Sequence, residues 1–379
     1  MVGIRVLQVF TIMDRGGAES MIMNYYRALD RSKIQFDFLV HREKRGHFDD
    51  EIEKLGGQIF RMNPINPFFP NSYYVQLRSF FETHKNYKIV HSHINTFSYF
   101  TLKIAQEFGL PHRIAHAHIA MKKLTISDFF LGGEGLKDTL KKIIKLRLRK
   151  RIHQHANYYY ACGNLAGNWL FGKKTDFGIM NNAVNSRDFQ PNTAVSNTYK
   201  KEFGIETDLI IGHVGRFVNQ KNHHYLLKVF KEIVSKKSNC KLILIGDGPL
   251  RQEVEHQGKQ LGIDTNIYFL GVRDDIPQLY QMMDVFIFPS LYEGLPVTLV
   301  EAQAAGLKIF ASDSITPEIA ITDDIKFLSI TEAPNLWAKE VLKYTKPEKK
   351  NNIELVVNNG FDIVENARAM ESFYLGLNS

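Results

Sequence analysis

Two cations and two carboxylates in the second half of the chain stand at spacings that suit one binding site. Arg216 and Lys221 are five positions apart in GRFVNQKN, and Glu293 and Glu301 are eight positions apart in EGLPVTLVE. A fixed Arg and Lys stabilise the charge that grows on a departing diphosphate, and two carboxylates accept hydrogen bonds from different sugar hydroxyls. The four residues therefore predict a nucleotide-sugar site. The structural alternatives are two surface cations and a capped helix that carries two glutamates.

The elements expected around the carboxylates are a buried strand followed at once by a helix. The strand ends at residues 286–288, and VTLVEAQAA has apolar residues at helical spacing. Glu293 then precedes the helix N-terminus, whose free amides and dipole attract an anion, and Glu301 lies well along the helix. The residues expected at the helix start are Gly294, Leu295 and Pro296.

Two glycine-containing loops follow strands in the same half of the chain. Gly215 follows LIIGHV, and the loop of Gly246, Asp247 and Gly248 follows KLILI. Glycine permits a tight turn and a close approach of the backbone to a ligand. The second loop is not a dinucleotide fingerprint, because Arg251 stands where a third glycine is needed.

A glycine pair also follows the first strand of the chain. Gly16 and Gly17 open a helix in GGAES, so that backbone amides can approach a phosphate or an acceptor. A tight turn with a helix cap is the structural alternative.

Histidines are frequent at the ends of two expected strands, in HSH and IAHAH. His91 and His93 share one face by strand alternation, and so do His116 and His118. A histidine pair suggests a metal site, but no Asp-x-Asp element accompanies it, and we expect no bound metal and no cofactor. We interpret His91 as a structural histidine.

The excess of basic residues lies entirely in the first half of the chain. Residues 1–190 contain 28 Lys and Arg against 16 Asp and Glu, whereas residues 191–379 contain 20 against 24. Much of the excess lies in GLKDTLKKIIKLRLRKRIHQ, a basic amphipathic helix that suits an anionic membrane surface. A solvated helix face is the alternative. Nucleic-acid binding is not expected, because no recognisable module accompanies the charge.

Length and cysteine content indicate the domain number and the cellular setting. A chain of 379 residues fits two domains, and two widely spaced cysteines suggest neither a disulfide framework nor a zinc site. The N-terminal apolar run is too short for a signal peptide, and no run is long enough to span a bilayer. These features predict a cytoplasmic protein with at most peripheral membrane contact.

Strand-like and helical runs alternate twice along the chain, which predicts an α/β protein of two doubly wound, Rossmann-like domains with parallel sheets. We expect the first domain at residues 1–190 and the second at 200–360, with a polar linker at 185–201 and a final helix from about 362 to 379 that returns to the first domain.

Five motifs in order resemble the retaining family-4 glycosyltransferases of the GT-B fold. They are GGAES, HSH with IAHAH, GRFVNQKN, IGDGPL and the Glu-x7-Glu segment. The resemblance implies two domains that face a cleft, with the acceptor bound by the first and the donor by the second. It implies that Arg216 and Lys221 bind the donor diphosphate and that Val272 and Arg273 frame the base. Either His116 or His118 could contact the donor sugar.

The resulting hypothesis is a retaining transferase that uses a nucleoside diphosphate sugar, expected to be a UDP-sugar. Glu293 would hold the hexose and Glu301 the ribose. The basic first half favours a lipid-linked acceptor, as in capsule, exopolysaccharide or lipopolysaccharide assembly. The alternatives are a catalytically silent binding subunit and another GT-B enzyme such as a glucan synthase. One departure from the family is Asn182-Ala183, where relatives often have Asn-Gly at a turn with positive backbone angles.

Overall fold

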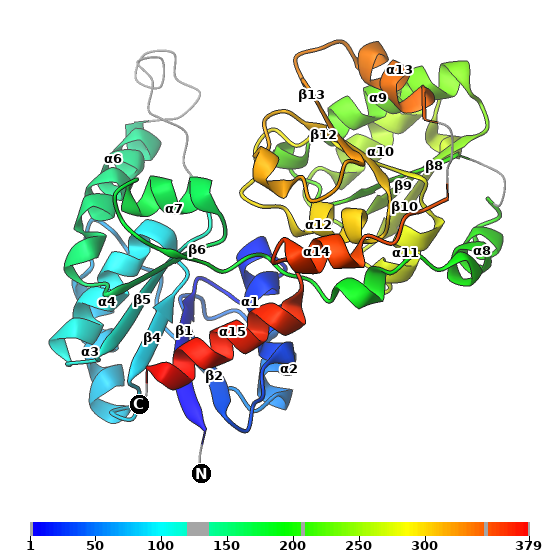
Figure 1. The fold of residues 1–379 in the computed structure, drawn as a ribbon. Helices are drawn as coiled ribbons and strands as arrows, with labels where there is room; N and C mark the ends of the chain where they lie inside the picture. Colours follow the sequence, from blue (N-terminus) through cyan, green and yellow to red (C-terminus); the bar gives the residue numbers. More distant parts are fainter. Residues whose placement is uncertain (1–2, 120–135, 206–208, 345–347, 378–379) are drawn as a thin grey trace. The chain divides into compact units, whose positions relative to one another are not determined.

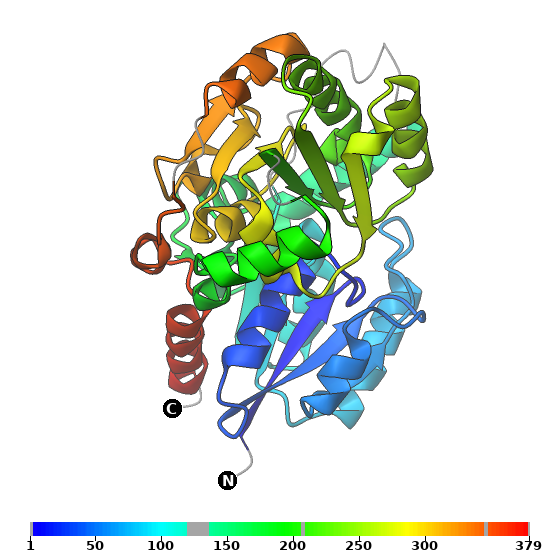
Figure 2. The same cartoon turned by 90° about the vertical axis from the view of Figure 1, so that its right-hand side faces the viewer.

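The computed structural model describes residues 3–119, 136–205, 209–344 and 348–377. These residues form two compact units, the first of Met1–Asn182 with Ile363–Ser379 and the second of Ala183–Asp362. Figure 1 shows the elements of each unit, and Figure 2 shows them from a second direction. Within the described ranges, no helix is long and apolar enough to cross a membrane.

The first unit contains a seven-stranded parallel sheet in the order β3-β2-β1-β4-β5-β6-β7. Its central strand β1 is fully buried from Val6 to Phe10, as expected for a parallel sheet covered on both faces. The strands are β1 (Ile4–Phe10), β2 (Ile34–Val40), β3 (Ile59–Arg61), β4 (Ile89–Ser92), β5 (His112–Ala117), β6 (Tyr158–Ala161) and β7 (Gly178–Ile179).

Helices of the first unit cover its sheet, and the last one comes from the far end of the chain. Helix α15 packs against α1 and β2 (Figure 1). The side chain of its Tyr374 is fully buried. The helices are α1 (Gly17–Ala28), α2 (Asp49–Lys54), α3 (Asn71–Thr83), α4 (Ser98–Glu107), α6 (Leu136–Arg151), α7 (Asn164–Phe171) and α15 (Ile363–Gly376), with 3-10 turns at Asn95–Phe97 and Ile152–Gln154.

The second unit contains a six-stranded parallel sheet in the order β10-β9-β8-β11-β12-β13. Its strands are β8 (Leu209–Val214), β9 (Cys240–Ile245), β10 (Ile267–Gly271), β11 (Val285–Phe288), β12 (Lys308–Ser312) and β13 (Ile325–Leu328). Its helices are α8 (Thr193–Glu202), α9 (His223–Lys236), α10 (Arg251–Gln260), α11 (Ile276–Met282), α12 (Val297–Ala304), α13 (Pro334–Leu342) and α14 (Ile353–Asn358). Four 3-10 turns lie at Ser186–Phe189, Asn219–Lys221, Asp264–Asn266 and Pro317–Ile319.

The linker predicted at residues 185–201 is wrong, because most of this segment is folded into the second unit. Asn192 caps helix α8 by accepting a hydrogen bond from the Val195 amide at 3.1 Å. Its own amide donates to Gln281 at 2.9 Å, and the Tyr199 hydroxyl donates to Asp275 at 3.0 Å. The segment is polar because a few anchoring side chains attach an otherwise exposed helix.

The turn at Asn182-Ala183 does not use positive backbone angles. Among the described non-glycine residues, Asn95 and Asn222 have positive φ, and Asn182 does not. The chain instead continues in an extended path, in which the Val184 amide donates to the Phe361 carbonyl at 3.0 Å. The absence of glycine at this position therefore causes no backbone strain.

Candidate active site

The loops that follow β8, β9 and β10 meet at the carboxyl edge of the second sheet. The Gly215 amide donates to the Ile245 carbonyl at 2.9 Å, and the Gly246 amide donates to the Gly271 carbonyl at 2.7 Å. These bonds extend the strand pairing beyond the strand ends. Parallel sheets commonly bind ligands at this edge, because their loops converge there.

Glycine is required at two positions of the loop after β9. Gly246 has φ +131°, and a Cβ built there would lie 2.2 Å from the Gly215 carbonyl oxygen. A Cβ at Gly248 would lie 2.5 Å from the Phe217 carbonyl oxygen, and the Phe217 amide donates to the Asp247 carbonyl at 3.0 Å. The predicted loops of Gly215 and Gly246 to Gly248 are therefore in direct backbone contact.

Lys221 and Glu293 form an ion pair at this edge. The Lys221 Nζ lies 2.7 Å from Glu293 Oε1, and the two side chains are 15% and 9% exposed. Lys221 also lies 4.5 Å from the centre of the Phe288 ring at the end of β11. Two residues that are 72 positions apart, one predicted to bind diphosphate and one to bind the sugar, are thus brought into contact.

Arg216 is exposed at the same loop, and its side chain makes no hydrogen bond or ion pair with the residues that the structure describes. Its backbone carbonyl accepts the Val218 amide at 2.8 Å, which tightens the turn after β8. The guanidinium therefore keeps all of its donors available to an anion.

Glu301 lies in α12 beside the buried ring of Tyr280. The Tyr280 hydroxyl donates to Glu301 Oε2 at 3.1 Å and also lies 3.2 Å from the Thr298 carbonyl. Burial raises the pKa of Glu301 to about 7, although the Tyr280 hydrogen bond acts in the opposite direction. A carboxyl with this pKa responds strongly to new hydrogen-bond donors near neutral pH.

The remaining residues predicted for the donor site lie around this edge. Leu295 is 5% exposed, and it lies with Gly294 and Pro296 directly before the first residue of α12. Val272, after β10, is 52% exposed, and the neighbouring Arg273 is paired with Asp275 at 2.6 Å. Arg273 therefore has an anionic partner already, whereas Val272 presents an apolar surface.

The glycine pair of the first unit lies where β1 passes into α1. Gly16 is the N-cap residue of α1, and a Cβ built on Gly17 would meet nothing within 4 Å. A Cβ on Gly16 would lie 2.2 Å from Oε2 of Glu19, whose side chain folds back over the turn. Burial raises the pKa of Glu19 to about 7. This carboxyl was not among the residues that we predicted.

The four histidines of HSH and IAHAH form one buried cluster in the first unit. His91 Nε2 lies 3.1 Å from His116 Nδ1, and His93 Nδ1 lies 2.9 Å from His118 Nε2. Helix α15 closes the cluster, because the Tyr374 hydroxyl lies 2.7 Å from His91 Nδ1. Burial lowers the pKa values of all four, to about 3 for His91 and His118, so the cluster is neutral at physiological pH.

The positions of His116 and His118 within this cluster differ. His116 is fully buried, and its Nε2 has no partner among the described residues. His118 lies directly after β5, is 7% exposed and makes no hydrogen bond through Nδ1 to the described residues. His118 is therefore the better placed of the two to contact a ligand through a ring nitrogen.

Three of the histidines also have the spacing of metal ligands. Ring nitrogens of His91, His93 and His116 lie within 4.8 Å of one another. Neutral imidazoles at this spacing fit a transition metal. Hydrogen bonds to Gln8, Tyr374 and the neighbouring histidines nevertheless explain every ring nitrogen of this group except His116 Nε2.

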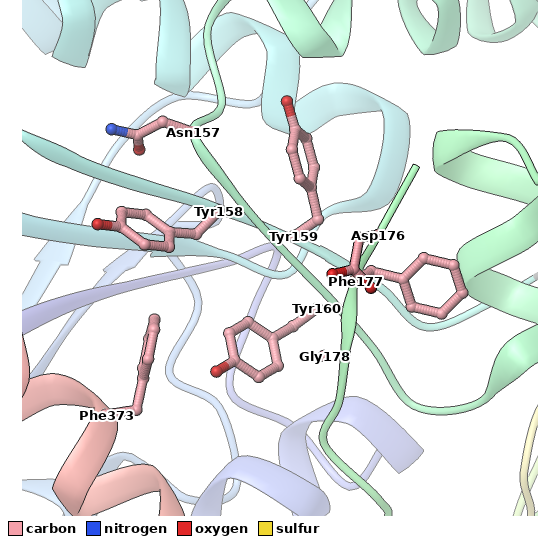
Figure 3. Close-up of a pocket in the computed structure, with 8 residues that line it drawn as sticks. All are labelled: Asn157, Tyr158, Tyr159, Tyr160, Asp176, Phe177, Gly178 and Phe373. Carbon is pink, nitrogen blue, oxygen red and sulfur yellow. The ribbon is translucent and has the colours of Figure 1, made fainter. Parts of the chain in front are cut away.

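A separate hollow of about 320 Å³ lies on the first unit and contains none of the predicted site residues. Figure 3 shows the residues around it, which come from β6, β7, the residues directly before these two strands, and α15. Its lining consists of Asn157, Tyr158, Tyr159, Tyr160, Asp176, Phe177, Gly178 and Phe373.

Comparison with known proteins places these features in a family. Residues 195–354 match the model of "Glycosyl transferases group 1". The chain is 36% identical over 379 residues to the putative glycosyltransferase EpsF of Bacillus subtilis (strain 168), covering 98% of this chain and 96% of that protein. It is 27% identical to the capsular polysaccharide biosynthesis glycosyltransferase CapH of Staphylococcus aureus, covering 98% of this chain and 99% of that protein.

A third relative has a more specific name. The UDP-Gal:alpha-D-GlcNAc-diphosphoundecaprenol alpha-1,3-galactosyltransferase of Escherichia coli is 24% identical over 217 residues, covering 55% of this chain and 56% of that enzyme.

Solved structures agree with the predicted fold. HepE of Anabaena, solved in complex with UDP, matches with a TM-score of 0.76 at 16% identity, covering 99% of this chain and 100% of that one. WaaG, a glycosyltransferase involved in lipopolysaccharide biosynthesis, matches with a TM-score of 0.67 at 15% identity, covering 97% and 95%. The predicted GT-B architecture of two Rossmann-like domains is confirmed. The 36% identity over nearly the full length of EpsF shows that the chain belongs to the group 1 family of glycosyltransferases.

Proposed function

We propose that the protein transfers a hexose from a UDP-sugar to an acceptor hydroxyl and retains the anomeric configuration, as the resemblance to family 4 implies. The observation that carries this proposal is the edge of the second sheet, where exposed Arg216 and the Lys221–Glu293 pair lie beside the glycine loops. Glu301 lies in α12, the helix that follows the Glu293 loop. The UDP bound in the HepE complex supports the choice of nucleotide.

In this proposal each charged residue has one role. Arg216 and Lys221 bind the diphosphate and stabilise its increasing negative charge as the sugar leaves, which lowers the barrier more than it strengthens substrate binding. Glu293 accepts hydrogen bonds from hexose hydroxyls, and Glu301 accepts them from the ribose. The bond from the anomeric carbon to the diphosphate oxygen breaks, and the acceptor oxygen bonds to the same face while its proton passes to the departing phosphate.

We further propose a lipid-linked saccharide as the acceptor, in the assembly of a capsule, an exopolysaccharide or lipopolysaccharide. The diphosphoundecaprenol-linked acceptor named for the Escherichia coli relative supports this choice. We place the reaction on the cytoplasmic side of a membrane, a setting that suits Cys162 and Cys240, which are buried and form no disulfide.

The donor is tested by calorimetric titration of the wild-type protein with UDP-, GDP- and ADP-sugars, followed by transfer to a crude lipid acceptor. We expect a UDP-sugar to bind most tightly and UDP to be released only when acceptor is present. The anomeric coupling constant of the product reports the stereochemistry, and inversion would contradict the retaining mechanism. Tight donor binding without transfer to any lipid fraction would instead favour the silent binding subunit.

Addition of EDTA is expected to leave the transfer rate largely unchanged. Arg216, Lys221 and the start of α12 supply the positive countercharge that a divalent metal ion supplies in other transferases. The measurement compares initial rates before and after exhaustive chelation, with metal content determined on the same samples. A rate that falls to background and returns with manganese or magnesium would refute a metal-free donor site.

The basic helix α6 is the surface that we propose for membrane contact. Ile144 packs against the core and Leu148 is 7% exposed, whereas Leu140 is 45% exposed. Because Ile144 and Leu148 of α6 face the core of the first unit, we expect membrane contact to depend on basic side chains more than on insertion of apolar ones. Each basic residue near an anionic surface contributes about 1 kcal/mol.

Replacing four basic residues of α6 by glutamine is therefore expected to reduce binding to anionic vesicles steeply. The four residues are Lys141, Lys142, Lys145 and Arg149. Binding of the wild-type protein should also weaken with salt, because surface attraction is screened over about 8 Å at physiological ionic strength. A vesicle co-sedimentation assay measures both effects.

The matched control changes the same amount of charge in the second unit, at Lys228, Lys236, Lys237 and Lys259. It should bind vesicles as the wild type does, and both variants should still bind UDP. Equal losses in the two variants would mean that net charge, and not helix α6, determines the membrane contact.

A further inference from the structure

Both carboxylate oxygens of Glu293 accept hydrogen bonds from side chains of the loop after β8. Oε1 accepts from the Lys221 Nζ at 2.7 Å, and Oε2 accepts from the Gln220 carboxamide at 3.0 Å. The Glu293 side chain is only 9% exposed. The oxygens that would bind hexose hydroxyls in the proposed function therefore already have partners within the protein.

Gln220 is fixed to the loop after β11 by contacts that do not depend on Lys221. The Gln220 carboxamide also donates to the Tyr292 carbonyl at 2.9 Å, and the Gln220 backbone carbonyl accepts the Leu291 amide at 2.8 Å. The neighbouring Asn222 donates to the Pro289 carbonyl at 3.2 Å. The two loops thus stay together, and Gln220 keeps its hold on Glu293, if the Lys221 amine turns elsewhere.

Glu293 is the one anion that Lys221 contacts among the described residues. Burial lowers the pKa of neighbouring His213 to about 4 and that of His223 to about 2, so these rings carry no charge near pH 7. An arriving diphosphate therefore meets a Lys221 ammonium whose charge Glu293 already neutralises.

We propose that Lys221 exchanges partners when the donor binds. It neutralises Glu293 in the empty site and moves to the diphosphate in the complex, which frees Glu293 Oε1 for the hexose hydroxyls. Gln220 acts as a positioning residue that retains Oε2 and keeps the carboxylate oriented. This inference rests on the proposed function, in which Lys221 binds diphosphate and Glu293 binds the sugar.

The exchange couples the two halves of the donor. When UDP binds alone, part of its binding free energy is used to separate Lys221 from Glu293. Once they are separated, Glu293 can bind the hexose more tightly. Because such coupling is reciprocal, the hexose also raises the affinity of the site for UDP. The structure therefore predicts an unusual result, in which removal of the Glu293 charge strengthens nucleotide binding while it impairs recognition of the sugar.

The test compares the affinities of purified full-length variants for UDP and UDP-glucose by calorimetry. Glu293→Gln is expected to bind UDP about 3- to 10-fold more tightly than wild type, with little further gain from the glucose. Lys221→Met should weaken UDP binding, and the double variant Lys221→Met/Glu293→Gln should bind UDP no better than Lys221→Met. Gln220→Ala should leave UDP affinity near that of wild type and reduce the additional affinity for UDP-glucose.

Glu340→Gln provides the matched control, because Glu340 forms an ion pair with Lys326 at 2.6 Å in the same unit. It should leave UDP affinity unchanged. Unchanged or weaker UDP binding by Glu293→Gln overturns the exchange, as does equal tightening in Glu340→Gln or in the Lys221→Met background. If the exchange fails while Arg216→Ala still weakens UDP binding, the proposed donor site stands. No binding of UDP, GDP or ADP by wild type overturns both proposals.

Discussion

Replacement of Arg216 or Lys221 by alanine is expected to lower the transfer rate by about 10- to 1000-fold, the scale of losing one charge-stabilising contact in a transition state. Arg216 is exposed on the turn after β8, and removal of its side chain leaves no buried partner unsatisfied. Replacement of Lys221 leaves Glu293 without its cation, so this variant also changes the surroundings of the carboxylate. Initial rates with saturating donor report the effect on catalysis. Thermal unfolding curves of the same variants report the effect on stability.

The two cations act on the same diphosphate, so we expect the double variant to lose less than the product of the single effects. Lys326→Ala serves as the control, because Lys326 forms an exposed ion pair on β13. Normal turnover in the Arg216→Ala/Lys221→Ala double variant would show that the diphosphate does not bind at this edge.

Glu301→Ala is expected to weaken UDP binding by about 10- to 100-fold, the range for a hydrogen bond to a charged group. Glu293→Ala should have no such effect on UDP and should chiefly impair recognition of the hexose. The pH dependence is a second readout. Burial raises the pKa of Glu301 to about 7, and ribose hydroxyls that donate to its carboxylate would favour the charged form.

Nucleotide binding should therefore release a proton from Glu301, so that UDP affinity rises as pH increases toward about 7 and levels off above it. The terminal phosphate of UDP also loses a proton near pH 6, which raises UDP affinity with pH in the same direction. The Glu301→Gln variant measures this phosphate contribution without that of Glu301. Calorimetry in two buffers of different ionisation enthalpy counts the proton. Identical pH profiles for wild type and Glu301→Gln, or equal loss of UDP affinity in both alanine variants, would contradict the assigned roles.

The sequence was sufficient to predict the fold because parallel strands leave a strong local signal. Runs such as RVLQVF and KLILI are mostly apolar, because their central residues are buried on both faces of the sheet, and each is followed by a helix. The predicted linker failed for the opposite reason. Helix α8 is attached mainly through Asn192, Tyr199 and Lys200, and such sparse anchors leave the composition polar.

The sequence indicated candidate site residues, but it could not indicate which residues would contact them. Arg216, Lys221 and both glutamates lie in local motifs, whereas Gln220 acquires its role only because β8 and β11 are neighbours in the sheet. Tyr280 reaches Glu301 in the same non-local way. Strand alternation placed each histidine pair on one face, but the sequence could not show that β4 and β5 bring both pairs together beneath Tyr374 of α15.

The most direct test of the donor site is a crystal structure of the full-length protein with UDP-glucose. We expect the diphosphate to lie within hydrogen-bonding distance of Arg216 and Lys221, the ribose at Glu301 and the glucose at Glu293, with Lys221 turned away from that carboxylate. A nucleotide bound away from the loops after β8 and β11, with the Lys221–Glu293 pair intact, would contradict this assignment.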